Sequence, residues 1–160
     1  MPQFEPFLVR HLEGELAEWI ENAPLPSLGA GPSVPILQHW LEHTPAGAPK
    51  FSSLSRSLLY LLAGDLDASH TISQSIDTAD GSFLHGIMHR REGDFSNAKY
   101  WFRRVGKHPV LLQLATTDYG DAMRFIDRCE AALGRDSAEE RLCERLQWLE
   151  WQSLYAHFAA

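Results

Sequence analysis

The sequence predicts an all-α protein, built from helical hairpins that pack as a compact, repeat-like bundle. Three observations predict this class. Apolar residues recur at helical spacing along most of the 160 residues. A Gly-Asp-apolar turn occurs twice, and no segment shows the period-two alternation of β-branched and aromatic residues that strands need. The length and the hydrophobic share of 44% suit one sizeable core, so we expect a single domain over residues 1–160.

Residues 1–50 are expected to hold N-terminal helices and loops rich in proline and glycine. Apolar residues at i, i+3 and i+4 spacing predict a helix over residues 3–22. A loop follows, and Pro35, which is tolerated in the first turn, predicts the start of a short helix that ends at His43. Residues 44–50 form a second helix-breaking segment.

The region 51–106 is expected to hold two stacked helical hairpins, residues 52–77 and residues 81–106. The recurring turn is Gly64-Asp65-Leu66 and, 29 residues later, Gly93-Asp94-Phe95. In each copy the glycine permits a left-handed cap, and the aspartate can cap the helix that follows. By the same reasoning Asp80 is the predicted N-cap of a helix over residues 81–92.

Residues 107–160 are expected to form C-terminal helices. One helix is predicted over residues 118–133, and the sequence leaves the state of residues 110–115 open. The last helix begins with Ser137 and Glu140, the spacing of a capping box. Beyond its leucines this helix carries a second apolar stripe, which predicts packing on two sides: Trp148, Trp151 and Tyr155.

The second turn carries a family resemblance. The segment Gly93-Asp-Phe-Ser-Asn-Ala98-Lys-Tyr-Trp-Phe102 resembles the inter-helix turn of tetratricopeptide and Sel1-like repeats. The longer segment HRREGDFSNAKYWFRRVGKHP, residues 89–109, is similar to a signature of an uncharacterised bacterial family. Both resemblances imply a helical fold, and the family resemblance implies no activity.

Charge and composition narrow the function classes and the partners. The net charge of −7 argues against a nucleic-acid partner. No uncharged apolar run approaches 18 residues, so no membrane span is expected. The first residues lack a basic and apolar leader, and the two cysteines lack CxxC spacing. These features predict reduced thiols and a cytoplasmic location.

A candidate metal site lies on the helix predicted over residues 81–92. His85, His89 and Glu92 fall at i, i+4 and i+7, on the side opposite the apolar residues of this helix. Two imidazoles at this spacing and a carboxylate are ligands that a divalent metal such as zinc uses. Gly86 occupies the place where zinc proteases carry a catalytic glutamate. The alternative interpretation is an exposed polar face with no metal.

Further histidines bear on this hypothesis. His70 or His108 is the expected additional ligand if a metal binds. His39 and His43 repeat the same spacing on a short helix, where surface histidines are the simpler interpretation.

A second candidate site is a basic island in this acidic chain. Between His89 and Lys107 six basic residues against two acidic ones give a charge of +4, so the rest of the chain carries −11. Guanidinium groups bind carboxylates and phosphates bidentately, which favours a small anionic ligand. The predicted ligand-binding residues are His85, His89, Arg90, Arg91, Asn97, Tyr100 and Arg104. The alternative is that these cations pair with acidic residues elsewhere in the chain.

Three hypotheses about function follow. The leading one is a non-enzymatic helical domain that binds a protein partner or a small anionic ligand near residues 85–104. The second is a metal-dependent enzyme that uses His85, His89 and Glu92. The third is a structural subunit that forms a homo-oligomer through its aromatic C-terminal helix. No nucleophile–base motif and no phosphate-binding loop is present to assign a reaction.

Overall fold

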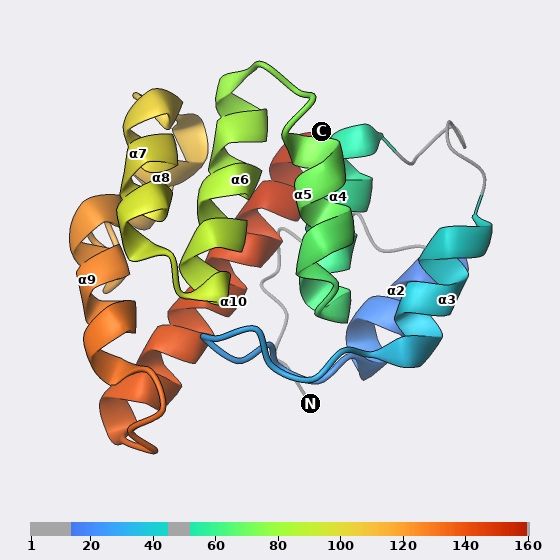
Figure 1. Ribbon diagram of the computed structural model, residues 1–160, viewed down its shortest axis with the longest axis horizontal. Helices are drawn as coiled ribbons and strands as arrows, with labels where there is room; N and C mark the ends of the chain where they lie inside the picture. Colours follow the sequence, from blue (N-terminus) through green and yellow to red (C-terminus); the bar gives the residue numbers. More distant parts are fainter. Residues whose placement is uncertain (1–13, 45–51, 160) are drawn as a thin grey trace.

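The computed structural model describes residues 14–44 and 52–159, and every regular element in these ranges is an α-helix (Figure 1). The predicted all-α class is confirmed, and the helices pack around one apolar core as a compact bundle. No described helix has both the length and the apolar content that crossing a membrane requires. The helices are α2 Gly14–Asn22, α3 Pro35–His43, α4 Ser53–Ala63, α5 Leu66–Ser73, α6 Ala79–Glu92, α7 Phe95–Val105, α8 Pro109–Leu114, α9 Ala122–Ala132 and α10 Ala138–Ala159.

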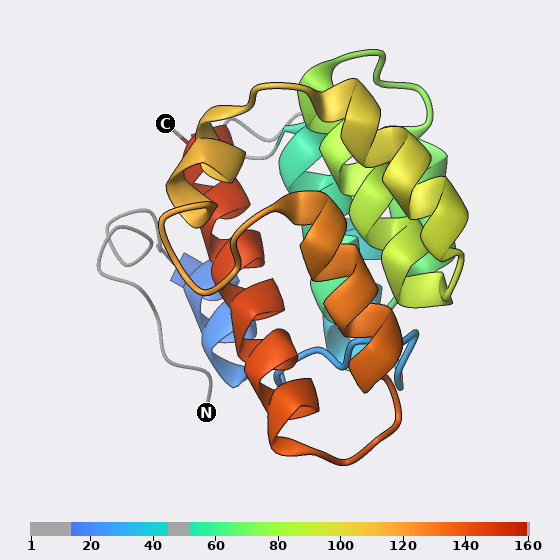
Figure 2. The same cartoon turned by 90° about the vertical axis from the view of Figure 1, so that its left-hand side faces the viewer.

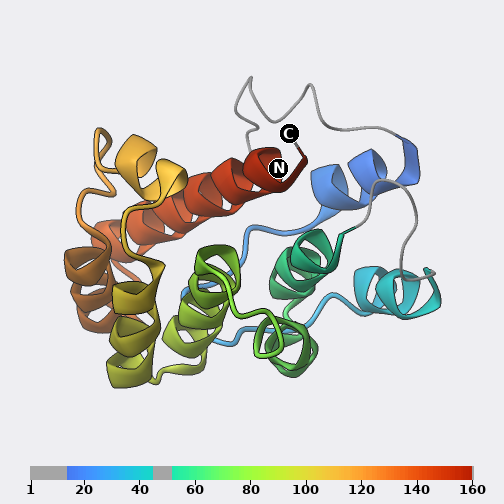
Figure 3. The same ribbon diagram turned by 90° about the horizontal axis from the view of Figure 1, so that it is seen from above.

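Helices α4 to α7 form the centre of the bundle. Each packs on the next along the chain, so the two predicted hairpins lie side by side (Figure 1). Figure 2 shows α9 beside the first part of α10 and α8 near its end. Seen from above, the long α10 runs along one side of the row formed by α5, α6 and α7 (Figure 3). Helix α6 is thus enclosed by α5, α7 and the layer behind them.

The recurring turn has the same structure in both copies. Gly64 and Gly93 adopt left-handed backbone conformations, with φ of 76° and 89°. The carboxylate of Asp65 accepts a hydrogen bond from a backbone amide of α5 at 3.0 Å. Asp94 does the same for α7 at 3.2 Å. Each turn therefore reverses the chain and caps the next helix, as the sequence predicts.

Two predictions at the ends of α5 and α6 are wrong. Helix α5 ends at Ser73 rather than near Asp77. The N-cap of α6 is Thr78, whose hydroxyl accepts a hydrogen bond from the amide of Gly81 at 3.1 Å. Asp80, the predicted cap, lies in the first turn of α6 because Thr78 already has the extended backbone that a cap requires.

The remaining helix boundaries largely follow the sequence. Helix α3 occupies its predicted range. Residues 110–115, left open by the sequence, belong mostly to α8, and α9 begins at Ala122 rather than at residue 118. The predicted helix over residues 3–22 can be compared only from Gly14, where α2 begins, because its first part lies outside the described residues. In the predicted helix-breaking segment 44–50, the residues after Thr44 also lie outside the described residues.

Two further predictions concern the interior. Trp148 and Trp151 are each 5% exposed, and the indole N–H of Trp151 donates to the carbonyl of Leu58 at 2.8 Å. Packing of α10 on two sides is thereby confirmed, so self-association, if it occurs, does not use these two rings.

Cys129 and Cys143 are buried free thiols, while the cytoplasmic location inferred from them stays a prediction.

Candidate functional site

Three imidazoles meet between α5 and α6. His70 comes from α5, and His85 and His89 come from successive turns of α6. The Nε2 atoms of His70 and His85 lie 3.0 Å apart. One ring nitrogen from each of the three histidines lies within 4.8 Å of the other two. Of the two additional histidines that the sequence suggested, His70 therefore joins this cluster.

The two histidines of α6 are buried, which corrects one interpretation of the sequence. An exposed polar face was the alternative to a metal site, yet His85 is 5% and His89 is 7% exposed. The reason is tertiary, because α5 and α7 flank α6 and cover the face that helical periodicity left open. The indole of Trp101, on α7, stacks on His85 with ring centroids 3.9 Å apart and an angle of 15° between the planes.

Burial also affects the protonation of His85. Desolvation, followed by repulsion from His89 and His70, lowers the pKa of His85 to about 4. The imidazole of His85 is therefore neutral at pH 7, and its one nitrogen lone pair can accept a hydrogen bond or bind a metal ion.

Glu92 contacts the cluster through His89. Its Oε1 atom lies 2.5 Å from Nδ1 of His89, and its side chain is 41% exposed. Its carboxylate is grouped with His89 and Asp94 around one potential ligand position, and not with His70 or His85, so its role as a ligand beside His85 stays a prediction. A carboxylate that accepts from Nδ1 fixes the orientation of the imidazole and leaves Nε2 as the nitrogen that can bind.

Asn97, a predicted ligand-binding residue, also contacts His89. Its Nδ2 atom lies 3.2 Å from Nε2 and 3.4 Å from Nδ1 of the same ring. The lone pair of Nε2 points away from the ring, so a donor aligned with it would lie much farther from Nδ1 than from Nε2. Because the two distances are nearly equal, the amide of Asn97 lies against the ring and does not occupy the lone-pair direction of Nε2.

Arg90 and Arg91 do not line this cluster. Arg90 is buried and donates to both carboxylate oxygens of Glu150, at 2.6 and 3.0 Å. Arg91 is also buried and donates to the backbone carbonyls of Leu61, Gly29 and Ala30. Because α6 directs both side chains into the interior, the two guanidinium groups have partners inside the fold in place of the ligand that the sequence predicts.

Tyr100 and Arg104 lie at the outer edge of the cluster. Tyr100 is 49% exposed. The guanidinium carbon of Arg104 lies 5.4 Å from the ring centroid of Trp101, and one of its nitrogens lies 3.6 Å from the carboxylate of Asp77. Arg104 therefore covers the indole that covers His85. Helical periodicity assigned Trp101 to the core, and only its position across from α6 makes it part of the site.

Several cations of the basic island pair with acidic residues elsewhere in the chain, which is the alternative to an anion site. Arg90 pairs with Glu150, Arg104 approaches Asp77, and Lys99 lies 2.5 Å from Asp127. Acidic residues elsewhere in the chain thus neutralise much of its charge.

His108 belongs to a second cluster, with Asp80 and His157, whose chemistry does not suit a metal. Its Nδ1 atom accepts the amide of Val110 at 3.1 Å, so its proton lies on Nε2, 2.6 Å from Asp80. A metal ion at Nε2 would move the proton to Nδ1, against the amide N–H. The cluster caps α8 and ties it to α6.

Comparison with known proteins adds no family to this geometry: no family model, curated protein or solved structure matches the chain.

Proposed function

We propose that the protein is a divalent-metal-binding helical domain, with His70, His85 and His89 as ligands. The observation that carries this proposal is the convergence of three imidazole nitrogens, two of them 3.0 Å apart, with His85 and His89 buried and His70 partly buried. Glu92 orients His89 from behind, the arrangement in which a carboxylate commonly supports a metal-bound imidazole.

The ligand set favours zinc or a borderline metal of similar size. Zn–N bonds of about 2.0–2.1 Å at a tetrahedral angle place two ligand nitrogens about 3.3 Å apart. The His70–His85 separation of 3.0 Å is close to this value, and a ring nitrogen of His89 lies within 4.8 Å of both. Three protein ligands leave a fourth position for water or for a ligand atom, which is typical of zinc sites that perform chemistry.

The hypothesis of an anionic ligand held by the basic island has less support. Arg90 and Arg91 are used inside the fold, which leaves Tyr100 and Arg104 at the surface from the set of predicted contacts. A metal ion at the histidines would itself supply a positive charge beside Arg104. An anion reaching this edge is therefore compatible with the metal proposal, and does not compete with it.

Metal titration of tag-free, EDTA-treated protein tests the proposal. We expect one Zn²⁺ per chain by calorimetry, and a visible d–d absorption band with Co²⁺. At a free metal concentration 100 times Kd, binding adds about 2.7 kcal/mol of stability, which raises Tm by about 5–11 °C for a chain of this size.

Variants separate this site from weak surface binding. His70→Gln should abolish stoichiometric binding, and Glu92→Gln should weaken it about 10–100-fold. The matched control is His39→Gln with His43→Gln, a second histidine pair at the same spacing that is exposed. Absence of stoichiometric uptake in the wild type, or equal losses in His70→Gln and the control, would refute the proposal.

A further inference from the structure

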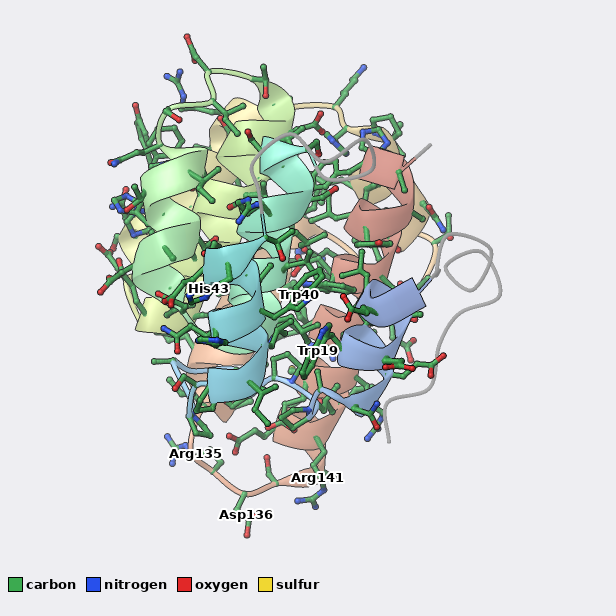
Figure 4. All side chains as sticks on the ribbon, turned by 90° about the vertical axis from the view of Figure 1, so that its right-hand side faces the viewer. Trp19, Trp40, His43, Arg135, Asp136 and Arg141 are labelled. Carbon is green, nitrogen blue, oxygen red and sulfur yellow. The ribbon has the colours of Figure 1, made fainter. Side chains whose placement is uncertain are left out.

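A second concave feature, which shares no residue with the histidine cluster, lies between α2 and α3. It is an open cavity of about 730 Å³. Figure 4 shows Trp19 of α2 and Trp40 of α3 turned toward each other between the two helices. The residues around the cavity include Glu15, Trp19, Ile36, His39, Trp40 and His43.

Two indoles form the aromatic wall of this cavity. The ring centroids of Trp19 and Trp40 lie 6.4 Å apart, with the planes inclined at 41°. A group placed about 5 Å from both centroids lies within the distance of about 6 Å at which a ring attracts a cation. Trp rings attract cations more strongly than Tyr or Phe rings do. The distance between the two centroids therefore allows one cation to lie within reach of both rings.

The charges around the cavity also favour a cation. Among the described residues that line it, Glu15 is the acidic one, and none of them is a lysine or an arginine. The indole N–H of Trp40 lies 3.4 Å from Oε2 of Glu15, which keeps the carboxylate at the edge of the aromatic wall. Nδ1 of His43 lies 2.8 Å from the carbonyl of His39, so this nitrogen donates within the helix.

We propose that the cavity formed by Glu15, Trp19 and Trp40 binds a small soluble organic cation that carries an alkylated ammonium group. Such a cation has an apolar surface, which suits the indoles and Ile36, and a positive charge, which suits the ring faces and the carboxylate. An alkylated ammonium also loses less hydration on entering than a bare ammonium does. This site shares no residue with the histidine cluster and does not depend on the proposed metal.

Choline and its neutral isostere 3,3-dimethylbutan-1-ol provide the test, because they have the same shape and differ in charge. Binding is measured by calorimetry and by Trp fluorescence. EDTA is present so that no metal binds to any histidine of the protein. We expect choline to bind at least about tenfold more tightly than the isostere. Equal affinities, or no choline binding, would overturn the proposal.

Variants locate the binding. Glu15→Gln, at an exposed position that leaves packing intact, should weaken choline binding about two- to fivefold, and Trp40→Leu by about tenfold or more. Lys99→Met, which breaks a partly exposed pair outside both sites, is the control and should leave choline affinity unchanged. If Glu15→Gln and Trp40→Leu bind choline as the wild type does, the cavity is not the site. Co-sedimentation with phosphatidylcholine vesicles without binding of free choline would overturn the assignment of a soluble ligand.

Discussion

The buried ion pair of Arg90 and Glu150 gives the sharpest test of how the basic island is used. The side chains are 0% and 1% exposed, and two hydrogen bonds join them. Tyr119 donates to the same carboxylate, and Gln147 accepts from Arg90 at 3.1 Å. Burial by itself would lower the pKa of Arg90, but the carboxylate of Glu150 raises it above its ordinary value, so the guanidinium stays charged.

Replacing one partner should therefore cost more than replacing both. Arg90→Met leaves a buried carboxylate with the hydroxyl of Tyr119 as its remaining partner, and should cost about 3–5 kcal/mol. For a chain of this size the loss lowers Tm by about 6–20 °C. Glu150→Leu should cost a similar amount, because it leaves the buried guanidinium without a counter-ion and with Gln147 as its hydrogen-bond partner. The double variant removes both charges, and we expect it to be at least as stable as either single variant.

Urea denaturation followed by far-UV circular dichroism measures these differences, with size-exclusion chromatography to confirm that each variant is monodisperse. Lys99→Met is the matched control. It breaks a pair with Asp127 whose side chains are 30% and 58% exposed, and should cost at most about 1 kcal/mol. A double variant whose loss equals the sum of the two single losses would refute the reasoning, since additivity would mean that the charges do not depend on each other.

Three further predictions concern packing, the remaining arginines and the buried thiol. Gly86→Ala should lower the free energy of unfolding by about 1–3 kcal/mol, because the alanine Cβ would lie 2.6 Å from the ring of Phe102. Helix propensity alone predicts the opposite, so an increase in stability would contradict this prediction. In urea denaturation Arg91→Ala should cost at least about 2 kcal/mol through unpaired carbonyls, and Arg104→Ala at most about 0.5 kcal/mol; equal losses would contradict the difference in burial. Burial raises the pKa of Cys129 to about 12, so the folded thiol holds a proton that the unfolded thiol releases above about pH 9. The free energy of unfolding should then fall by up to about 1.4 kcal/mol per pH unit between pH 9 and 12, less steeply in Cys129→Ala; identical slopes would argue against it.

Local signals predicted most of the fold. Turn chemistry at Gly64 and Gly93 set the hairpin reversals, and proline placed the start of α3. The main errors occurred where two residues competed for one role, as Thr78 and Asp80 did at the start of α6. Choosing between them depends on which residue has extended backbone, and that conformation is set by the path of the loop from α5.

The candidate site was harder to predict. Spacing placed His85 and His89 on one helix face, and it correctly separated them from the apolar face. It could not show that α5 would bring His70 to within 3.0 Å of His85, nor that Trp101 would stack there. These contacts join residues on different helices, whose rotation and separation follow from packing.

The sequence by itself determined the helices, their turns and the histidine spacing, because these depend on backbone propensity and on neighbours three or four residues apart. The tertiary structure alone decided which polar side chains are structural and which can bind. Arg90 and Arg91 are buried because they bind partners about 60 residues away, at Glu150 and Gly29. His85 and His89 were buried by flanking helices with a third imidazole beside them. The physical reason is that burial and partnership arise when separate helices pack, and helical periodicity reports on one helix at a time.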